Sequence, residues 1–342
     1  MNLKFDMNTD NEYSDLFTNR QDRRARKQKG NHAPKKSQAA IVQSLAQPDA
    51  LEGGMAYKTT YQPSRHESTW LLQSLTDFYR QEFITDVQAM VRGGKEASVY
   101  RCAARPGLGV DLLAAKVYRP RQFRQLRNDK MYREGRAILT ADGKEAKETD
   151  HRLMRAIGKK SDFGVQVEHT SWLMYEYNTL KTLYDAGAAV PKPYAVAENA
   201  ILMEYVGNEE MAGPTLSTVR LEQNEAHALF KETMRNVELM LVHGMIHGDL
   251  SSYNILYWEG KITLIDFPQV SSSYGNSQSH FILKRDIERV CAYFAGQGVK
   301  AAQNPDEIMR GLWKRHVEQD AESRAADLSR LEAQREENEW DD

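Results

Sequence analysis

The spacing of apolar residues divides the chain into a strand-rich first half and a helical second half. Short runs in which apolar residues alternate with polar ones, or follow one another without a break, predict strands. Such runs occur at 87–91, 97–104, 112–118, 194–198 and 200–206. After Gly207 the apolar residues recur every three or four positions, which is typical of helices. These helices are expected at 221–243, at about 284–296 and at 305–338.

Two more helices are predicted among the strands. Residues 68–84 are amphipathic and predict a helix that is capped near Ser68 or Thr69 and packs onto the domain after it. Residues 170–187 have helical spacing and stop at Gly187, a residue that favours the left-handed end of a helix.

Residues 119–165 break the strand pattern. They are rich in Arg, Lys and Asp, with a helical middle and no obvious apolar face. A stretch of this length without a core face is expected to be a mobile insertion between two elements of the fold.

Composition narrows the class of protein. Of the 342 residues, 41% are hydrophobic and 27% are charged, so the chain can bury a core and has room for two structural units. The net charge of -2 argues against a basic coat over the whole surface. Two cysteines make no disulfide framework, and neither a long apolar run nor a signal-peptide core is present. We therefore expect a soluble cytoplasmic protein with no membrane partner.

The small net charge hides an asymmetry between the two ends. Residues 20–36 hold eight basic side chains and one acidic one, whereas 317–342 hold ten acidic and three basic ones. The basic stretch is either a solvated tail or an arm that contacts the phosphates of RNA or of a ribosomal particle. The first 65 residues have almost no apolar periodicity and are expected to be disordered.

These patterns predict five parts. They are a disordered tail with the basic run (1–65), a helical extension (66–90), a strand-rich lobe with the insertion 119–165 (91–206), a helical lobe (207–312) and an acidic helical tail (313–342).

One stretch of the helical half points to chemistry. It reads His-Gly-Asp-Leu-Ser-Ser-Tyr-Asn-Ile-Leu over 247–256, and a predicted hairpin then leads to Ile265-Asp266-Phe267. Phosphoryl transfer needs a carboxylate that orients the attacking hydroxyl, and an amide and a second carboxylate that hold Mg²⁺ on the phosphates. Asp249, Asn254 and Asp266 supply these groups at the spacing of the kinase-like superfamily, with Gly248 in place of the usual Arg.

Such a site also needs a lysine on the third strand and a helical glutamate to anchor it. Lys116 lies in an apolar strand, where an unpaired ammonium is costly, and Glu176 lies on the next strong helix. The alternatives are a lysine that extends to the surface and a solvated glutamate on the outer face of the helix.

The expected phosphate loop departs from the usual glycine-rich pattern. The turn reads Gly93-Gly94-Lys95-Glu96-Ala97-Ser98-Val99, so its two glycines allow backbone N–H groups to approach a phosphate, and Lys95 and Ser98 can add contacts. A second string, Asp-Phe-Gly at 162–164, precedes the Asp249 loop and is interpreted as a coincidental turn.

Taken together, these motifs resemble the Rio family of atypical serine/threonine protein kinases over about residues 85–297. Within that family the chain resembles the branch that has no N-terminal winged helix, and it resembles a bacterial-type member of this branch. The matching stretches are GGKEASVY, AAKVYR, YEYNTLKTLYDAGAAVPKP, MEYVG, HGDLSSYNILYWEGKITLIDFPQ and FILKRDIERVCAYF.

The resemblance implies a role for each matching residue. Asp249 would be the catalytic aspartate, Asn254 and Asp266 the ligands of Mg²⁺ or Mn²⁺, and Asp266 also a candidate phospho-acceptor. Lys116, paired with Glu176, would hold the phosphates of ATP. The remaining nucleotide contacts would be Gly94, Lys95, Ser98 and Val99 in the loop and Met203, Glu204 and Val206 in the hinge, with Asp286 bracing the catalytic loop.

The resemblance also implies an α+β, bilobal protein-kinase-like fold. Its N-lobe is small and β-rich, and its helical C-lobe is reduced. Only 19 residues separate Asp266 from Asp286, which is too few for an activation segment and peptide-docking subdomains.

Three functions are compatible with the sequence. The first is an ATP- and Mg²⁺-dependent Rio-type serine/threonine kinase or ATPase that phosphorylates itself and acts in ribosome maturation, on a protein substrate that the sequence does not name. The second is a small-molecule kinase of the aminoglycoside or choline type, which shares the 247–256 motif. The third is a non-catalytic assembly factor that ATP switches between states.

Overall fold

The computed structural model describes residues 59–94, 96–119, 132, 134, 136, 138–140, 143–146, 151–159 and 161–318. The chain divides into two compact units, Met1–Gly54 and Met55–Asp342, and all the described residues belong to the second. The predicted basic stretch 20–36 and the part of the acidic tail after 318 lie outside the described residues.

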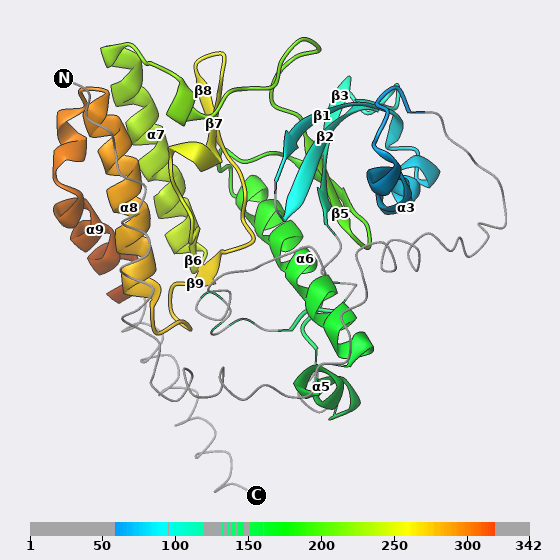
Figure 1. Ribbon diagram of the computed structural model, residues 1–342. Helices are drawn as coiled ribbons and strands as arrows, with labels where there is room; N and C mark the ends of the chain where they lie inside the picture. The colour runs from blue at the N-terminus through cyan, green and yellow to red at the C-terminus, as the bar shows by residue number, and fades with distance from the viewer. Residues whose placement is uncertain are drawn as a thin grey trace, which may run out of the picture. The chain divides into compact units, whose positions relative to one another are not determined.

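The strands before residue 207 form one five-stranded antiparallel sheet (Figure 1). Its strand order is β1-β2-β3-β5-β4. Its strands are β1 (Ile84–Gly93), β2 (Ala97–Ala104), β3 (Leu112–Tyr118), β4 (Pro193–Val196) and β5 (Ala200–Glu204). All five predicted strands are confirmed. β1 begins at Ile84, the last residue of the predicted helix 68–84, rather than at the predicted residue 87.

Helix α3 (Arg65–Arg80) covers one face of this sheet (Figure 1). Leu71, Leu75 and Phe78 are fully buried on this helix and share a hydrophobic cluster with β1, β2 and β3. The predicted packing of this helix is confirmed, but its predicted cap is wrong. The helix begins after Ser64, whose backbone N–H donates to the Glu67 carboxylate at 3.4 Å, because a serine three residues before a glutamate forms a capping box.

The opposite face of the sheet packs on α6 (Asp162–Asp185), which follows the short helix α5 (His151–Gly158). α6 starts well before the predicted residue 170. The Asp-Phe-Gly string is not a separate turn, because the Ser161 hydroxyl accepts the Gly164 N–H at 3.2 Å and the string forms the first turn of α6. The helix ends as predicted at Gly187, which has a φ of 75°.

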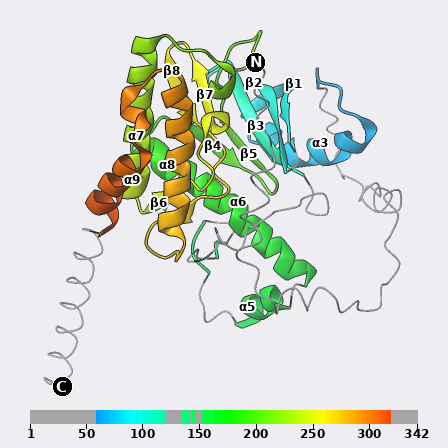
Figure 2. The ribbon, with the colours of Figure 1, turned by 60° about the vertical axis from the view of Figure 1, so that its left-hand side comes forward.

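The second half contains α7 (Gln223–Val242), α8 (Ser279–Gly296) and α9 (Pro305–Trp313), which lie together in both views (Figures 1 and 2). A π-helical turn, Lys314–Glu318, follows α9, and the rest of the predicted helix 305–338 lies outside the described residues. No helix among the described residues has the length and apolar character that a membrane span requires.

Short strands and 3₁₀ turns connect these helices. The predicted hairpin is confirmed as β7 (Ile255–Trp258) and β8 (Lys261–Leu264), and β6 (Met245–Ile246) pairs with β9 (Ser271–Ser272). The 3₁₀ turns are η3 (Leu216–Thr218), η4 (Ser252–Asn254) and η5 (Lys300–Gln303).

Strand β3 separates two hydrophobic clusters. Leu113, Ala115 and Val117 belong to the cluster under α3, whereas Ala114 and Tyr118 belong to the larger cluster that continues into α6, α7 and α8. This alternation follows from the two-residue period of a strand, and it places Lys116 on the face that looks toward the helical half.

Within the insertion 119–165, two described residues contradict the expectation that this segment lacks a core face. Tyr132 is 5% exposed and belongs to the larger cluster, and Leu139 is 7% exposed. The apolar residues around Tyr132 and Leu139 follow no helical or strand period, so the sequence pattern did not predict that these two side chains are buried.

The packing of α3 predicts that it is an integral part of the fold. Leu75→Ala should lower the free energy of unfolding by about 3 kcal/mol, because it leaves a cavity at a fully buried position. Gln73→Ala, on the exposed side of the same helix, should change it by less than about 0.5 kcal/mol. Both values come from chemical denaturation, and equal losses in the two variants would show that α3 does not pack as described.

Candidate functional site

Lys116 is the centre of the site. Its Nζ donates to Oε1 of Glu176 at 2.7 Å and to Oδ1 of Asp266 at 2.6 Å. The Lys116 side chain is 9% exposed, which excludes a lysine that extends to the surface. Burial by itself lowers the pKa of Lys116, but the carboxylates of Asp266 and Glu176 outweigh it and raise that pKa well above its usual value. The ammonium is therefore a permanent positive charge.

Glu176 anchors this lysine from the middle of α6. It is 1% exposed, so the solvated glutamate is excluded as well. Its second carboxylate oxygen accepts a hydrogen bond from the Tyr118 hydroxyl. Because Tyr118 and Lys116 lie two residues apart on one face of β3, the strand delivers both donors to the same carboxylate.

Asp266 follows β8 in an unusual backbone conformation. Its φ is 71°, in the left-handed region that non-glycine residues rarely occupy, and its side chain is 44% exposed. Burial pushes the pKa of Asp266 upward, but the adjacent Lys116 outweighs this effect and holds the pKa below its usual value. Asp266 thus remains an anion that contacts the lysine and is partly exposed to solvent.

His247 connects the Asp249 loop to the Asp266 segment. Its Nε2 lies 3.1 Å from the Ile265 carbonyl, and its Nδ1 lies 3.3 Å from the Asp249 N–H. A carbonyl can only accept and an amide can only donate, so the proton is on Nε2 and Nδ1 is an acceptor. Burial lowers the pKa of His247, which agrees with this neutral form.

Asp249 has partners on both carboxylate oxygens. Oδ1 accepts from Nη1 of Arg289 at 2.9 Å, and Oδ2 accepts from Nδ2 of Asn254 at 3.2 Å. The same Asn254 nitrogen donates to the Asp249 carbonyl at 2.8 Å. Since the nitrogen of this amide faces Asp249, the oxygen is the atom that Asn254 can offer to a cation.

The peptide before Asp249 is held from both sides by α8. The Gly248 N–H donates to Oδ2 of Asp286 at 2.8 Å, and the Gly248 carbonyl accepts from Arg285. Burial raises the pKa of Asp286 to about 7, with Arg285 opposing the shift. Asp286 lies in the middle of α8, which begins at Ser279, earlier than the predicted helix at about 284–296.

The insertion reaches the same loops. Nη1 of Arg285 donates to the Tyr132 hydroxyl at 2.8 Å. Arg136 donates to the Pro268 carbonyl at 3.0 Å and to the Val270 carbonyl, both just after Asp266. Sequence reasoning missed Tyr132, Arg136 and Arg285, as well as Arg289. The spacing of Arg285 and Arg289, one helical turn apart beside Asp286, was the one available clue.

The turn between β1 and β2 is tight. The Gly94 N–H donates to the Ala97 carbonyl at 2.9 Å, and a Cβ on Gly94 would lie 2.7 Å from that oxygen, so the position needs glycine. Val99 is paired with Lys116 and shares its face of the sheet. Ser98 is 1% exposed on the opposite face, so its side chain points away from Lys116. Lys95 lies outside the described residues.

The predicted hinge lies at the end of β5. Met203 pairs with Ala114, which puts it on the Lys116 face, and it is 9% exposed. The Glu204 N–H donates to the Lys192 carbonyl at 2.8 Å, and the Val206 carbonyl accepts from the Gly213 N–H at 2.8 Å.

Asp266 and Asn254 offer oxygen ligands of the kind that suits a magnesium ion shared with phosphates. The described residues contain no group of three or more His, Cys, Asp and Glu side chains arranged around a cation. Magnesium is usually held by one or two carboxylates together with substrate phosphates and water, so Asp266 and the Asn254 oxygen fit it.

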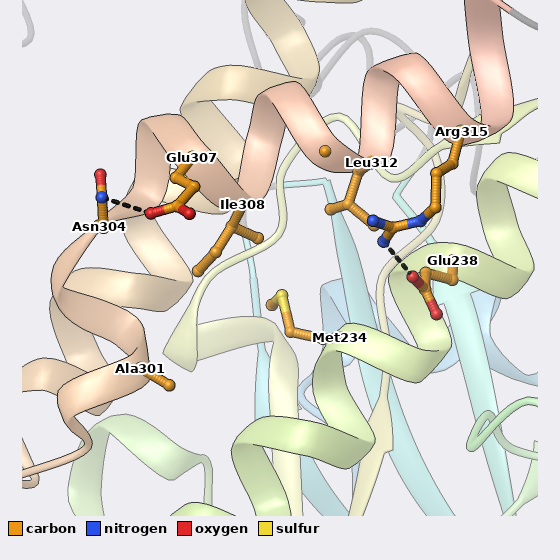
Figure 3. A pocket seen from close by; sticks show the side chains of 9 residues that line it. Met234, Glu238, Ala301, Asn304, Glu307, Ile308, Leu312 and Arg315 are labelled. Atoms are coloured by element: carbon orange, nitrogen blue, oxygen red, sulfur yellow. Dashed lines mark hydrogen bonds and ion pairs between the residues drawn. The ribbon is translucent and has the colours of Figure 1, made fainter.

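A cavity of about 400 Å³ lies elsewhere, between α7 and α9 (Figure 3). Met234, Ile308 and Leu312 line it, and an ion pair of 2.6 Å joins Arg315 to Glu238 at its edge. None of the predicted site residues lines this cavity.

Comparison with known proteins identifies the family. The model of the RIO domain matches residues 112–308, which is more than half of the chain and contains Lys116, Glu176, Asp249, Asn254 and Asp266. The chain therefore belongs to the RIO domain family, and its fold is the protein-kinase-like α+β fold with an antiparallel sheet and a helical second part.

Two relatives are similar in sequence. The RIO-type serine/threonine-protein kinase Rio1 of Haloferax volcanii is 35% identical over 132 residues, 38% of this chain and 44% of that protein. The serine/threonine-protein kinase RIO1 of Chaetomium thermophilum is 26% identical over 238 residues, 66% of this chain and 42% of that protein. The chain thus spans less than half the length of these relatives.

One structural similarity is to the Rio2 kinase-ADP/Mg²⁺-phosphoaspartate complex from Chaetomium thermophilum. It has a TM-score of 0.44 and 16% identity, and it covers 77% of this chain and 81% of that one.

The geometry of Gly248 generates a prediction about stability. Gly248 and Gly298 have φ values of 83° and 87°, so alanine should cost each about 1 kcal/mol of backbone strain. A Cβ at Gly248 would also lie 2.2 Å from the Gln269 carbonyl, whereas nothing lies within 4 Å at Gly298. Gly248→Ala should therefore destabilise the fold by about 2 kcal/mol more than Gly298→Ala, as measured by chemical denaturation. Equal destabilisation by the two substitutions would contradict the close approach of Gly248 to the Gln269 carbonyl.

Proposed function

We propose that this chain is an ATP- and Mg²⁺-dependent serine/threonine kinase or ATPase of the RIO type, and so a phosphotransferase. The observation that supports it most directly is the buried Lys116 ammonium, 2.7 Å from Glu176 and 2.6 Å from Asp266. A lysine fixed in this way can neutralise nucleotide phosphates beside a metal-binding carboxylate. Membership of the RIO family supports the same assignment.

Each side chain has a task in this proposal. Lys116 binds the phosphates of ATP, and Glu176 fixes the position of its ammonium. Asp249 accepts a hydrogen bond from the attacking hydroxyl and orients it. Asp266 and the Asn254 oxygen are the protein ligands of a magnesium ion, which would neutralise the charge that develops on the transferred phosphate.

The adenine would lie against the Lys116 face of the sheet, between Val99 and Met203. The Glu204 N–H and the Val206 carbonyl already have partners in the chain, so the Glu204 carbonyl and the Val206 N–H would pair with the base. In the turn, Gly94 would allow the phosphates to approach the backbone. Lys95 would add its charge, and Ser98 would contribute its backbone, because its side chain faces the other way.

Several finer assignments belong to the same proposal. Between Asp266 and the start of α8 at Ser279, the described chain contains β9 and no helix, which supports a reduced C-lobe without an activation segment or a peptide-docking subdomain. We assign the chain to the branch without a winged helix and place it in the cytoplasm. The basic stretch 20–36 would bind ribosomal RNA during ribosome maturation.

Lys116→Met tests the proposal. It should reduce ATP turnover by about a hundredfold or more, because the phosphates lose a fixed positive charge. Lys181→Met is the control, because it removes an exposed lysine that is paired with Asp185 on α6, the helix that also carries Glu176. This variant should change turnover less than about twofold. Turnover is followed as phosphate release from γ-labelled ATP with Mg²⁺. Full turnover in the Lys116 variant, or transfer of the label to an aminoglycoside or to choline, would refute the proposal.

A second experiment asks whether Asp266 takes the phosphate. In that step a carboxylate oxygen of Asp266 bonds to the γ-phosphorus, the bond from that phosphorus to the bridging oxygen breaks, and ADP leaves. The wild-type chain should then acquire a label that hydroxylamine removes, because an acyl phosphate is a mixed anhydride, and Asp266→Asn should abolish it. Label that resists hydroxylamine and disappears in Asp249→Ala would instead show transfer to a serine or threonine of the chain itself.

A further inference from the structure

Each carboxylate oxygen of Asp249 already has a partner in this structure, although the proposed reaction requires Asp249 to receive a hydroxyl. Arg289 occupies Oδ1 at 2.9 Å, and Asn254 occupies Oδ2 at 3.2 Å. Each oxygen can accept a second hydrogen bond, but a hydroxyl that approaches Oδ1 has to compete there with the Arg289 guanidinium.

Of the two partners of Asp249, the more exposed one can move away from its carboxylate more easily. Asn254 is 8% exposed, and its nitrogen is also fixed by the Asp249 carbonyl at 2.8 Å. The Arg289 side chain is 37% exposed, and the described residues offer its guanidinium no hydrogen-bond acceptor other than Asp249. A half-exposed ion pair of this kind contributes little net stability, so Arg289 can swing away at small cost.

We propose that Arg289 selects the acceptor, and that it favours a hydroxyl flanked by acidic residues in a peptide. This inference rests on the proposed function, because it names the acceptor class of the same site. A carboxylate beside the hydroxyl takes over the Arg289 guanidinium, so one charge-assisted pair replaces another and Oδ1 of Asp249 becomes available to the hydroxyl. A peptide with flanking lysines offers no such exchange and is repelled.

The surroundings of Arg289 support an anionic partner. Arg285, one turn earlier on α8, adds a second guanidinium beside the Asp249 loop. The acidic neighbour on the helix, Glu288, is directed to Lys284 at 3.7 Å. Tyr253, on the loop that bears Asp249, is 63% exposed and offers a ring against which a bound peptide can pack.

The test uses two fluorescein-labelled serine peptides that differ only in two flanking residues on each side, glutamate in one and lysine in the other. Fluorescence anisotropy gives their dissociation constants for the full chain, and γ-labelled ATP gives phosphate transfer. The variants are Arg289→Gln and Arg289→Glu. Lys284→Gln is the control, because it removes the same charge from an exposed side chain of the same helix. This control also accounts for any attraction between the basic stretch 20–36 and the acidic peptide.

The acidic peptide should bind about fivefold more weakly to Arg289→Gln than to Lys284→Gln. Arg289→Glu should reverse the preference in favour of the lysine peptide, which a general loss of structure would not do. Melting temperatures of all variants are compared with that of the wild type to show that they fold. Equal preferences in Arg289→Gln and Lys284→Gln, or no reversal in Arg289→Glu, would overturn the inference.

The two proposals fail in different ways. If the acidic preference depends on Arg289 but the chain releases no phosphate from γ-labelled ATP, Arg289 still selects an acidic segment and the proposed function fails. If both peptides are phosphorylated with equal efficiency and equal affinity, the kinase proposal stands and the role of Arg289 is refuted.

Discussion

A buried ammonium is the constraint on which the rest of the structure depends. Removing the charge of Lys116 from water is expensive unless carboxylates of good geometry surround it. The two that do so come from α6 and from the segment after β8, 60 and 150 residues further along the chain. The sheet, the long helix and the C-terminal hairpin must therefore all be in place before this charge is tolerated, which links the two halves of the domain.

The Asp249 loop is held by side chains of α8 that bind its backbone and by the side chain of its own His247. The Gly248 peptide is held at its N–H by Asp286 and at its carbonyl by Arg285, and the neutral His247 connects the loop to Ile265. Each of these groups would be costly to bury alone, and each satisfies another. The position of Asp249 is therefore fixed by α8 and by the Ile265 carbonyl just before Asp266.

Much of the fold and of the candidate site could be predicted, namely the parts that local pattern and motif spacing determine. The strands, the hairpin and the set from Lys116 to Asp266 all have short motifs with a chemical reason for their spacing. The direction of Ser98 was also available from the two-residue period of β2, although the phosphate-loop interpretation overlooked it. The contacts of Tyr132, Arg136 and Arg289 were not available, because they join residues 40 to 153 positions apart and leave no periodic trace.

The left-handed backbone of Asp266 has a consequence for how its chemistry can be studied. At a φ of 71°, aspartate and asparagine are among the few residues with a side chain that are found without severe crowding. Replacing the carboxylate by an amide therefore changes charge and leaves the local conformation nearly alone, whereas alanine would add the strain of an unsuitable backbone to the loss of the charge. The conformation that orients this carboxylate also restricts the side chains with which evolution or an experimenter can replace it.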